Sequence, residues 1–278
     1  MDIQQAVNRH ISHNKRLAAC LAIVFVAGVF IPVFLVLLLI SRTALAVFPA
    51  LVVALVWSFV AWRRSDAVVL DLAGARDANV ESDARLFNVV NGLRAAMGLP
   101  SLDLYLVDED AMNAFSTGRD PNHASLVLTT GLIERLDLIE LEAVIALELF
   151  KIKTHETLPQ SFVVPTYGVS LVLAEAADSM PWLANFLRLP TPWVDAILAK
   201  VSSSQRDLER DVEATAYTRY PPALADALEK ISGKSALGVA APVTAHLWVA
   251  PATAPSANPS TSKLHAPIAD RVAVLQEL

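Results

Sequence analysis

The chain has 278 residues, of which 54% are hydrophobic and only 18% are charged, whereas soluble domains carry about 25% charged residues. This shortfall indicates sequence embedded in a membrane, so the lipid bilayer is the first expected partner. The net charge of −6 gives no basis for a nucleic-acid partner, and the single cysteine, Cys20, excludes an internal disulfide and a cysteine metal site.

Two apolar runs without charges, Leu17–Ile40 and Ala44–Trp62, open the chain. A helix needs roughly 20 apolar residues to cross a bilayer core, and both runs are long enough. Only Ser41, Arg42 and Thr43 separate them, so they predict a tight transmembrane hairpin over 17–62. A pair of buried helices in a soluble protein is the alternative, and the length of the runs disfavours it.

Basic residues flank the hairpin on both sides and set its predicted orientation. Three precede it and two follow it, while the loop has one (Arg9, Lys15, Arg16; Arg63, Arg64; Arg42). By the positive-inside rule, both flanks are cytoplasmic. The sequence therefore predicts a multi-pass protein of the inner (cytoplasmic) membrane. Residues 1–16 form a cytoplasmic N-terminus, and residues 63–278 form the main domain on the same side.

The first part of that domain alternates between one helix and several short strands. Helical periodicity covers Asp83–Met97, and strand patterns cover Leu102–Val107, Asn113–Thr117 and Ser125–Thr129. Residues 118–122 form a turn between the last two strands. These patterns predict a small antiparallel sheet.

The rest of the domain is mainly helical, which makes the expected fold class α+β. A short helical turn is predicted at Gly131–Leu136. Longer helices are predicted at Ile139–Thr154, Gln205–Arg219, Pro222–Ile231 and Ile268–Leu278. Ala240–Ser262 is rich in Ala, Pro, Ser and Thr and is expected to be mostly loop.

Residues 160–200 are apolar at first and then interrupted by charges. Phe162–Leu173 is apolar but broken by Pro165 and Gly168, and neither half is an uncharged span. An amphipathic stretch on the membrane surface is the preferred interpretation. A second hairpin distorted by polar residues is the alternative.

Several segments resemble the HtpX family of membrane zinc metallopeptidases. Glu142–Lys153 resembles the helix that carries the family's His-Glu-x-x-His motif. Other segments resemble its flanks in the same order: Gly98–Pro100 with Leu104–Asp108, Asn113–Arg119, Leu128–Leu132, Asp137–Glu142, Gln205–Asp211, Thr218–Pro221, Ala245–Leu247 and His265–Arg271. Together they cover most of residues 85–278. The resemblance implies a gluzincin-like peptidase domain.

The sequence differs from the family pattern at the residues that would bind zinc. In such enzymes two histidines four residues apart bind zinc, a glutamate activates the bound water, and a later helix gives the third ligand. The resemblance places Leu147 and Lys151 at the histidine positions and Asp207 at the third ligand, while Glu148 keeps the general-base position. Leucine and a lysine ammonium offer no lone pair to a metal. No cofactor is therefore expected, and Glu148 is not expected to be functional.

Other groups near this position suggest what replaces the metal. No pair of the remaining histidines has ligand spacing. Glu148 lies on the apolar face of its helix, and a buried carboxylate without a partner is costly. We expect Lys151 to pair with Glu148 or Asp207 and to hold their two helices together; the alternative is that Lys151 points to solvent.

The resemblance leaves three functions open. The preferred one is an inactive homologue that binds membrane or unfolded protein segments without cutting them. An extended peptide would add to the edge strand formed by Asn113, Ala114, Phe115, Ser116 and Thr117. An ordinary edge covered by its own loops is the alternative for this strand.

The second function is an active zinc-dependent endopeptidase with an altered metal site, acting in membrane-protein quality control; zinc is expected only in that case. The third is a structural subunit that scaffolds a membrane complex.

Overall fold

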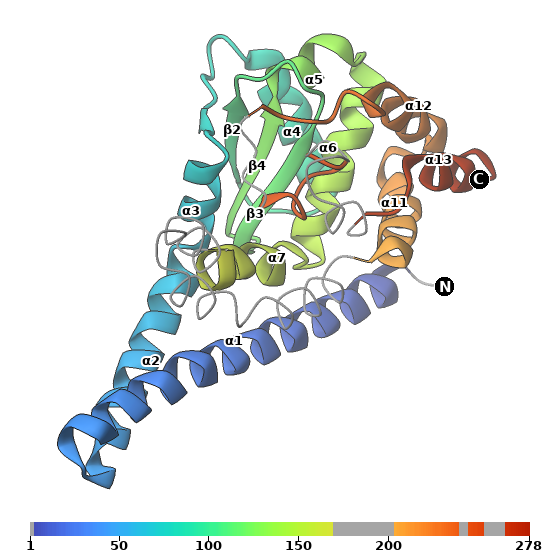
Figure 1. Cartoon of the computed structure of the whole chain (residues 1–278). Helices are drawn as coiled ribbons and strands as arrows, with labels where there is room; N and C mark the ends of the chain where they lie inside the picture. The colour runs from blue at the N-terminus through green and yellow to red at the C-terminus, as the bar shows by residue number, and fades with distance from the viewer. Residues whose placement is uncertain (1–2, 169–202, 239–243, 253–264) are drawn as a thin grey trace.

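A long N-terminal helix, α1 (Ile3–Ser41), runs beneath the rest of the protein in the computed structural model, which describes residues 3–168, 203–238, 244–252 and 265–278 (Figure 1). After a short turn, η1 (Ala44–Ala46), the chain returns through α2 (Val47–Arg63) into α3 (Ser65–Leu72). The predicted break between the two apolar runs is therefore confirmed.

Within the described residues, α1 is the one helix that is by itself long and apolar enough to cross a membrane, over Gln4–Ile40. Helices α2 and α3 together form a second candidate span, with a bend of 57° between them. Many apolar side chains of α1 and α2 are exposed, including Leu39 at 78% and Phe48 at 65%. Such exposure suits a lipid environment rather than water.

Helix α1 begins well before its apolar run, which starts at Leu17. Its first turns pack on the domain, because Val7 is buried in the main core and Asn14 is fully buried. The Asn14 side chain donates to the Thr154 carbonyl at 2.9 Å. Residues 3–16 are thus helical and packed on the domain.

The sheet has four strands in the order β1-β2-β4-β3. Their bounds are Arg76–Asp77, Asp103–Val107, His123–Thr129 and Ala114–Asp120, respectively. Strands β2 and β4 are parallel, so the prediction of an antiparallel sheet was wrong for this pair. The β3–β4 hairpin turns β4 back beside β2, and the consecutive apolar residues Leu126–Leu128 suit a central strand buried on both faces.

The β3–β4 hairpin depends on a glycine near its turn. Gly118 has φ +142° and lies at an irregularity in the pairing between Gly118 and Asp120. A Cβ at this position would lie 2.3 Å from the His123 carbonyl oxygen. The turn predicted at 118–122 is correctly placed, but β3 continues through Gly118 to Asp120.

Alternate strand residues face two different cores, as the pleat requires. Leu104, Leu106, Leu126 and Leu128 belong to the larger core, with residues of α4 (Ala84–Ala96) and α6 (Leu138–Lys153). Val107, Phe115 and Val127 belong to the smaller one, with Val69 of α3 and Trp248. The sheet is therefore covered on both faces.

The predicted helices of the domain are confirmed. Besides α4 and α6 they are α5 (Thr130–Arg135), α11 (Ser204–Thr218), α12 (Pro221–Ile231) and α13 (Ile268–Gln276). The described part of the predicted loop, 244–252, is irregular.

The chain after α6 forms α7 (Thr157–Val163) and η2 (Val164–Gly168). Helix α7 is buried, and Phe162 meets Phe25 of α1 edge-on with ring centroids 6.1 Å apart. The described part of the 160–200 segment thus packs inside the protein. The membrane-surface interpretation concerns residues 169–200, which lie outside the described residues.

Candidate functional site

Helix α6 carries the first group of site residues through the centre of the domain. A capping box fixes its start: the Asp137 side chain accepts from the Glu140 amide, and the Glu140 side chain accepts from the Asp137 amide. Leu147 and Glu148 are fully buried, and Lys151 is 2% exposed. The helix therefore places an acidic and a basic side chain in the buried interior.

These two charges form an ion pair. The Lys151 Nζ lies 2.9 Å from Oε2 and 3.1 Å from Oε1 of Glu148. Ser116 of β3 donates its hydroxyl to Glu148 Oε2 at 2.6 Å. The expected pairing of Lys151 with Glu148 is confirmed, and the alternative of a solvent-facing lysine was wrong. Both residues lie on α6, so the pair does not join α6 to the helix of Asp207 as expected. The Glu148 carboxylate thus has two polar partners, Lys151 and Ser116.

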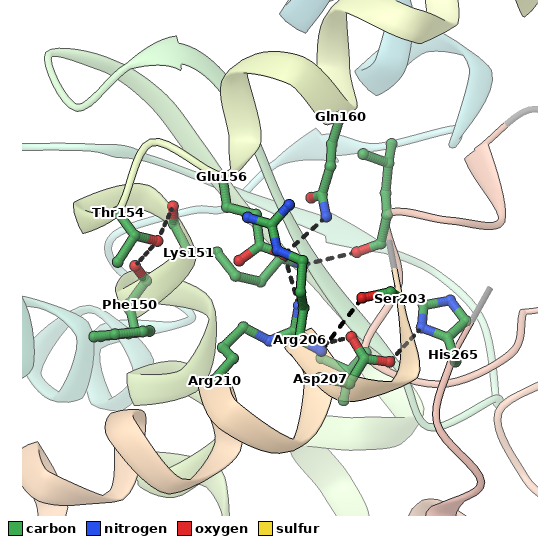
Figure 2. Close-up of polar contacts among 12 residues, drawn as sticks. Phe150, Lys151, Thr154, Glu156, Gln160, Ser203, Arg206, Asp207, Arg210 and His265 are labelled. Carbon is green, nitrogen blue, oxygen red and sulfur yellow. Dashed lines mark hydrogen bonds and ion pairs between the residues drawn. The ribbon is translucent and has the colours of Figure 1, made fainter. Parts of the chain in front are cut away.

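Helix α11 presents Asp207 to a different cation (Figure 2). Arg210 donates to Asp207 Oδ1 at 2.7 Å and to Glu156 Oε1 at 2.8 Å. Asp207 Oδ2 accepts the Ala266 amide at 2.9 Å and lies 3.5 Å from His265 Nδ1. Both carboxylate oxygens of Asp207 are thus engaged, and Arg210 supplies the charge that could have come from Lys151.

Neighbouring charges shift the pKa values of Asp207 and Arg210. Burial would by itself raise the pKa of Asp207, but the Arg210 guanidinium and then His265 outweigh it, so this pKa lies well below its usual range. Burial would lower the pKa of Arg210, but Glu156 and Asp207 raise it above its usual value. Asp207 and Arg210 are therefore both ionised at neutral pH.

A second buried arginine connects the C-terminal helix α13 to α11 by hydrogen bonds. Arg271 of α13 is fully buried and binds Asp211 with both ends of its guanidinium, at 2.6 and 2.8 Å. It also donates to the Val249 carbonyl at 2.6 Å. Two-point arginine–carboxylate pairs are geometrically specific, so this contact fixes the position of the chain around Val249.

Histidines near the cluster contact backbone carbonyls. His246 Nε2 lies 2.9 Å from the Gln160 carbonyl, and His265 Nε2 lies 3.2 Å from that of Ala245. Across the described parts of the chain, no group of three or more His, Cys, Asp or Glu side chains is placed to hold a metal ion. Arg210 joins α11 to Glu156 after α6, and the described residues of this site present no set of free metal ligands.

The predicted edge strand is at the edge of the sheet, but it is not exposed. Residues 113–117 are all fully buried. The Ala114 carbonyl accepts the Val249 amide at 2.8 Å, and Ser161 of α7 lies 2.7 Å from Thr117, between their hydroxyl oxygens. Two segments of the same chain cover this edge, as in the alternative considered from the sequence.

Three residues of the site were not identified from the sequence. Arg210 and Glu156 complete the charge cluster, and Ser116, expected only as an edge residue, holds Glu148. The signal for Arg210 was its position three residues after Asp207 on α11, where it shares the buried face. Glu156 lies in the turn after α6, and no local pattern marks it.

Comparisons with known proteins show the family to which the sequence is similar. Residues 81–278 match the model of peptidase family M48. The chain is 33% identical to a protease HtpX homolog of Acidiphilium cryptum over 82% of this chain and 86% of that protein. It is 29% identical to one of Dictyoglomus turgidum, over 80% and 79%. An alignment with that of Dictyoglomus thermophilum, at 33% identity, spans 63% of each chain, just under two thirds. No solved structure matches the chain.

Proposed function

The chain belongs to peptidase family M48, and from this membership we propose that it is a membrane-anchored, catalytically inactive HtpX-like homologue. The observation that carries the proposal is the Lys151 ammonium, which pairs with Glu148 at the centre of the α6 helix. A zinc peptidase needs lone pairs at the first and fifth motif positions, and Leu147 and Lys151 supply none.

The charge arrangement also disfavours a metal at this place. A divalent cation beside Lys151 and Arg210 would meet two positive charges in a buried site, where repulsion is strong. Asp207 has both oxygens engaged by Arg210, His265 and the Ala266 amide. Zinc would have to break these contacts before it could bind.

In this proposal the domain acts by contact rather than by cleavage. It binds protein segments, or it scaffolds a membrane complex through its surfaces. We propose that the α1 and α2 helices form a multi-pass anchor with the domain on the cytoplasmic side, and the basic residues on both flanks support this orientation. The apolar exposed surface of these helices supports the anchoring role.

Metal analysis of the purified full-length chain in detergent, combined with a peptide-cleavage assay, tests this proposal. We expect substoichiometric zinc and no cleavage above that of a Glu148→Gln variant. Stoichiometric zinc that disappears in Glu148→Gln and Asp207→Asn, but remains in Asp226→Asn, would overturn it. That result would establish the alternative, an active zinc endopeptidase with an altered site that could serve membrane-protein quality control.

A further inference from the structure

A groove with a volume of about 340 Å³ lies between the two N-terminal helices and α7. It is here called the α1–α2 groove, and its main lining residues are Lys15, Ala18, Ala19, Phe59, Trp62 and Phe162. Figure 1 shows α1 and α2 diverging from their turn toward the domain, with α7 beside α1. The volume falls in the range of ligand pockets, roughly 300–1,000 Å³. The groove is therefore large enough to hold part of a lipid chain.

Small side chains of α1 and aromatic side chains of α2 form the walls of the groove. Ala18 and Ala19 have no atoms beyond Cβ to fill the space. On α2, Phe59 and Trp62 contact each other with ring centroids 5.9 Å apart. Ser58 is the polar residue of this wall, and its hydroxyl donates to a carbonyl one turn earlier on the helix at 2.7 Å. The walls therefore offer apolar surface and no free hydroxyl group, which suits an aliphatic chain.

Contacts with the domain fix these walls. The Arg119 guanidinium of β3 lies over the Trp62 ring, 5.7 Å from its centroid, and donates to the Arg63 carbonyl at 3.2 Å. On the other side, the edge-on contact between Phe162 of α7 and Phe25 of α1 joins the domain to the first helix. Both walls of the groove are thus attached to the domain, which restricts their movement.

The charges at the domain end of the groove are mainly basic. Lys15 lines this end, is exposed, and forms no ion pair with any residue that the structure describes. Arg63 and Arg64 at the end of α2 are also exposed. The nearby Asp66 lies 3.8 Å from Arg119, and this contact leaves Lys15 available. Apolar walls beside available basic groups complement a molecule with an aliphatic chain and an anionic head.

We propose that the α1–α2 groove binds an anionic phospholipid, with one acyl chain between Ala19 and Trp62 and the phosphate at Lys15. Basic pockets between membrane helices on the cytoplasmic side bind anionic headgroups in this way. A hydrogen bond from an ammonium to a phosphate oxygen is charge-assisted and therefore strong. The inference goes beyond the proposed function, because no groove residue belongs to the buried ion pairs of α6 and α11. It rests only on the membrane anchor in that proposal.

A specific site differs in two respects from the lipid that surrounds any membrane helix. It prefers one headgroup charge, and one large side chain can fill it. Lys15 would set the first property, and the small side chain of Ala19 the second.

The test measures lipid adducts of the delipidated full-length chain in a non-ionic detergent by native mass spectrometry. Dioleoyl phosphatidylglycerol and dioleoyl phosphatidylcholine are the probes, because they share their acyl chains and differ in headgroup charge. We expect the wild type to bind phosphatidylglycerol about fivefold more tightly, the effect of one basic residue near an anionic headgroup. Equal affinities, or no adduct of either lipid because a protein segment fills the groove, would overturn the proposal. This comparison needs no variant, so it stays decisive if a variant does not fold.

Matched substitutions on α1 locate the binding site. Lys15→Gln should abolish the preference for phosphatidylglycerol, whereas Arg16→Gln, at an exposed position outside the groove, should keep it. Ala19→Trp should weaken binding of both lipids about tenfold, because the indole fills the groove. Cys20→Trp, also exposed and outside the groove, should bind like the wild type. Equal effects within either pair would show that lipid binds to the general surface of the helices and would refute the site.

Two further measurements separate this site from the proposed function. Flotation of the wild type with vesicles of pure phosphatidylcholine tests the anchor, and a chain that stays in solution would overturn the anchor and the lipid site together. A chain that floats but shows no headgroup preference keeps the anchor and loses the site. Zinc content and peptide cleavage on the same sample test catalytic inactivity, and the expected lipid preference does not depend on either result.

Discussion

At the residue scale, the site consists of carboxylates neutralised by basic side chains. Glu148 has Lys151, and Asp207 and Glu156 share Arg210. Removing one partner of a buried pair leaves an uncompensated charge, which typically costs about 3–5 kcal/mol. Each basic residue is therefore expected to be a strong determinant of stability, and two substitutions test this.

The first prediction concerns Lys151→Ala. This substitution leaves Glu148 buried without its cationic partner, so we expect the thermal unfolding midpoint to fall by roughly 6–20 °C. Lys153→Ala is the control, because Lys153 is only half-buried and loses a hydrogen bond to the Met97 carbonyl and a contact with the Tyr217 ring, together worth about 1–2 kcal/mol. Equal, small effects of the two substitutions would contradict a structural role for the Lys151–Glu148 pair.

A double variant separates the pair from the packing around it. Lys151→Met with Glu148→Gln removes both charges and keeps much of the side-chain volume. We expect it to recover most of the midpoint lost in Lys151→Met alone, because no charge is left unpaired. Additive losses in a double-mutant cycle would show that the two side chains do not interact.

The second prediction concerns Arg210→Ala and its pH dependence. In the wild type the pKa of Asp207 is depressed, so its contribution to stability is present above its unfolded pKa of about 3.9 and is lost as pH falls through the folded value. Without Arg210, the buried Asp207 loses the main charge that lowers its pKa, and burial raises a carboxyl pKa. The variant should therefore gain stability as pH falls from 7 to about 5.

Urea unfolding of both proteins at a series of pH values measures this difference. The exposed Arg85→Ala in α4 is the matched control and should follow the wild type. A variant that loses stability toward acid in parallel with the wild type would contradict the assigned role of Arg210.

At the element scale, the first turns of α1 belong to the domain as much as to the membrane anchor. Asn14 donates to Thr154 at the end of α6 and accepts from Arg206 of α11 at 2.5 Å. His10 lies 3.1 Å from Glu213 of α11. A helix that continues into the apolar span is thereby connected to both helices that carry the site.

The third prediction follows from this connection. Asn14→Ala leaves the buried Thr154 carbonyl without this donor and removes one partner of Arg206, so we expect a loss of about 1–3 kcal/mol. Asn8→Ala, at an exposed position on the same helix, should change stability little. If thermal unfolding shows equal midpoints for both variants, the start of α1 does not contribute to the stability of the domain.

At the scale of the whole molecule, the α1–α2 hairpin should place its turn and the domain on opposite sides of the membrane. Cys20 is the only cysteine, so a Cys20→Ser background allows single-site labelling. The exposed positions Leu45 in η1 and Ser232 after α12 report the two sides.

The fourth prediction is the outcome of that labelling. A membrane-impermeant maleimide should label Leu45→Cys in intact cells and should label Ser232→Cys only after the cells are opened. The positive-inside bias of the flanking residues is the physical reason. Labelling of Ser232→Cys in intact cells would place the domain outside and contradict the topology.

The sequence by itself determined the properties that depend on local composition and spacing. The apolar runs predicted the two N-terminal helices, periodicity predicted α6, α11, α12 and α13, and the order of motifs predicted the peptidase family. The sequence also placed a leucine and a lysine, Leu147 and Lys151, at the positions that the resemblance assigns to the zinc histidines, because this is a matter of residue type alone.

Only the tertiary structure decided which distant groups meet. The parallel pairing of β2 with β4, the placement of Arg210 between Glu156 and Asp207, and the cover over β3 all join residues far apart in the chain. The physical reason is that strand order and buried ion pairs depend on how whole elements pack, and no local pattern specifies that packing. The residue pattern of an edge strand, for example, does not show whether other segments of the chain cover it.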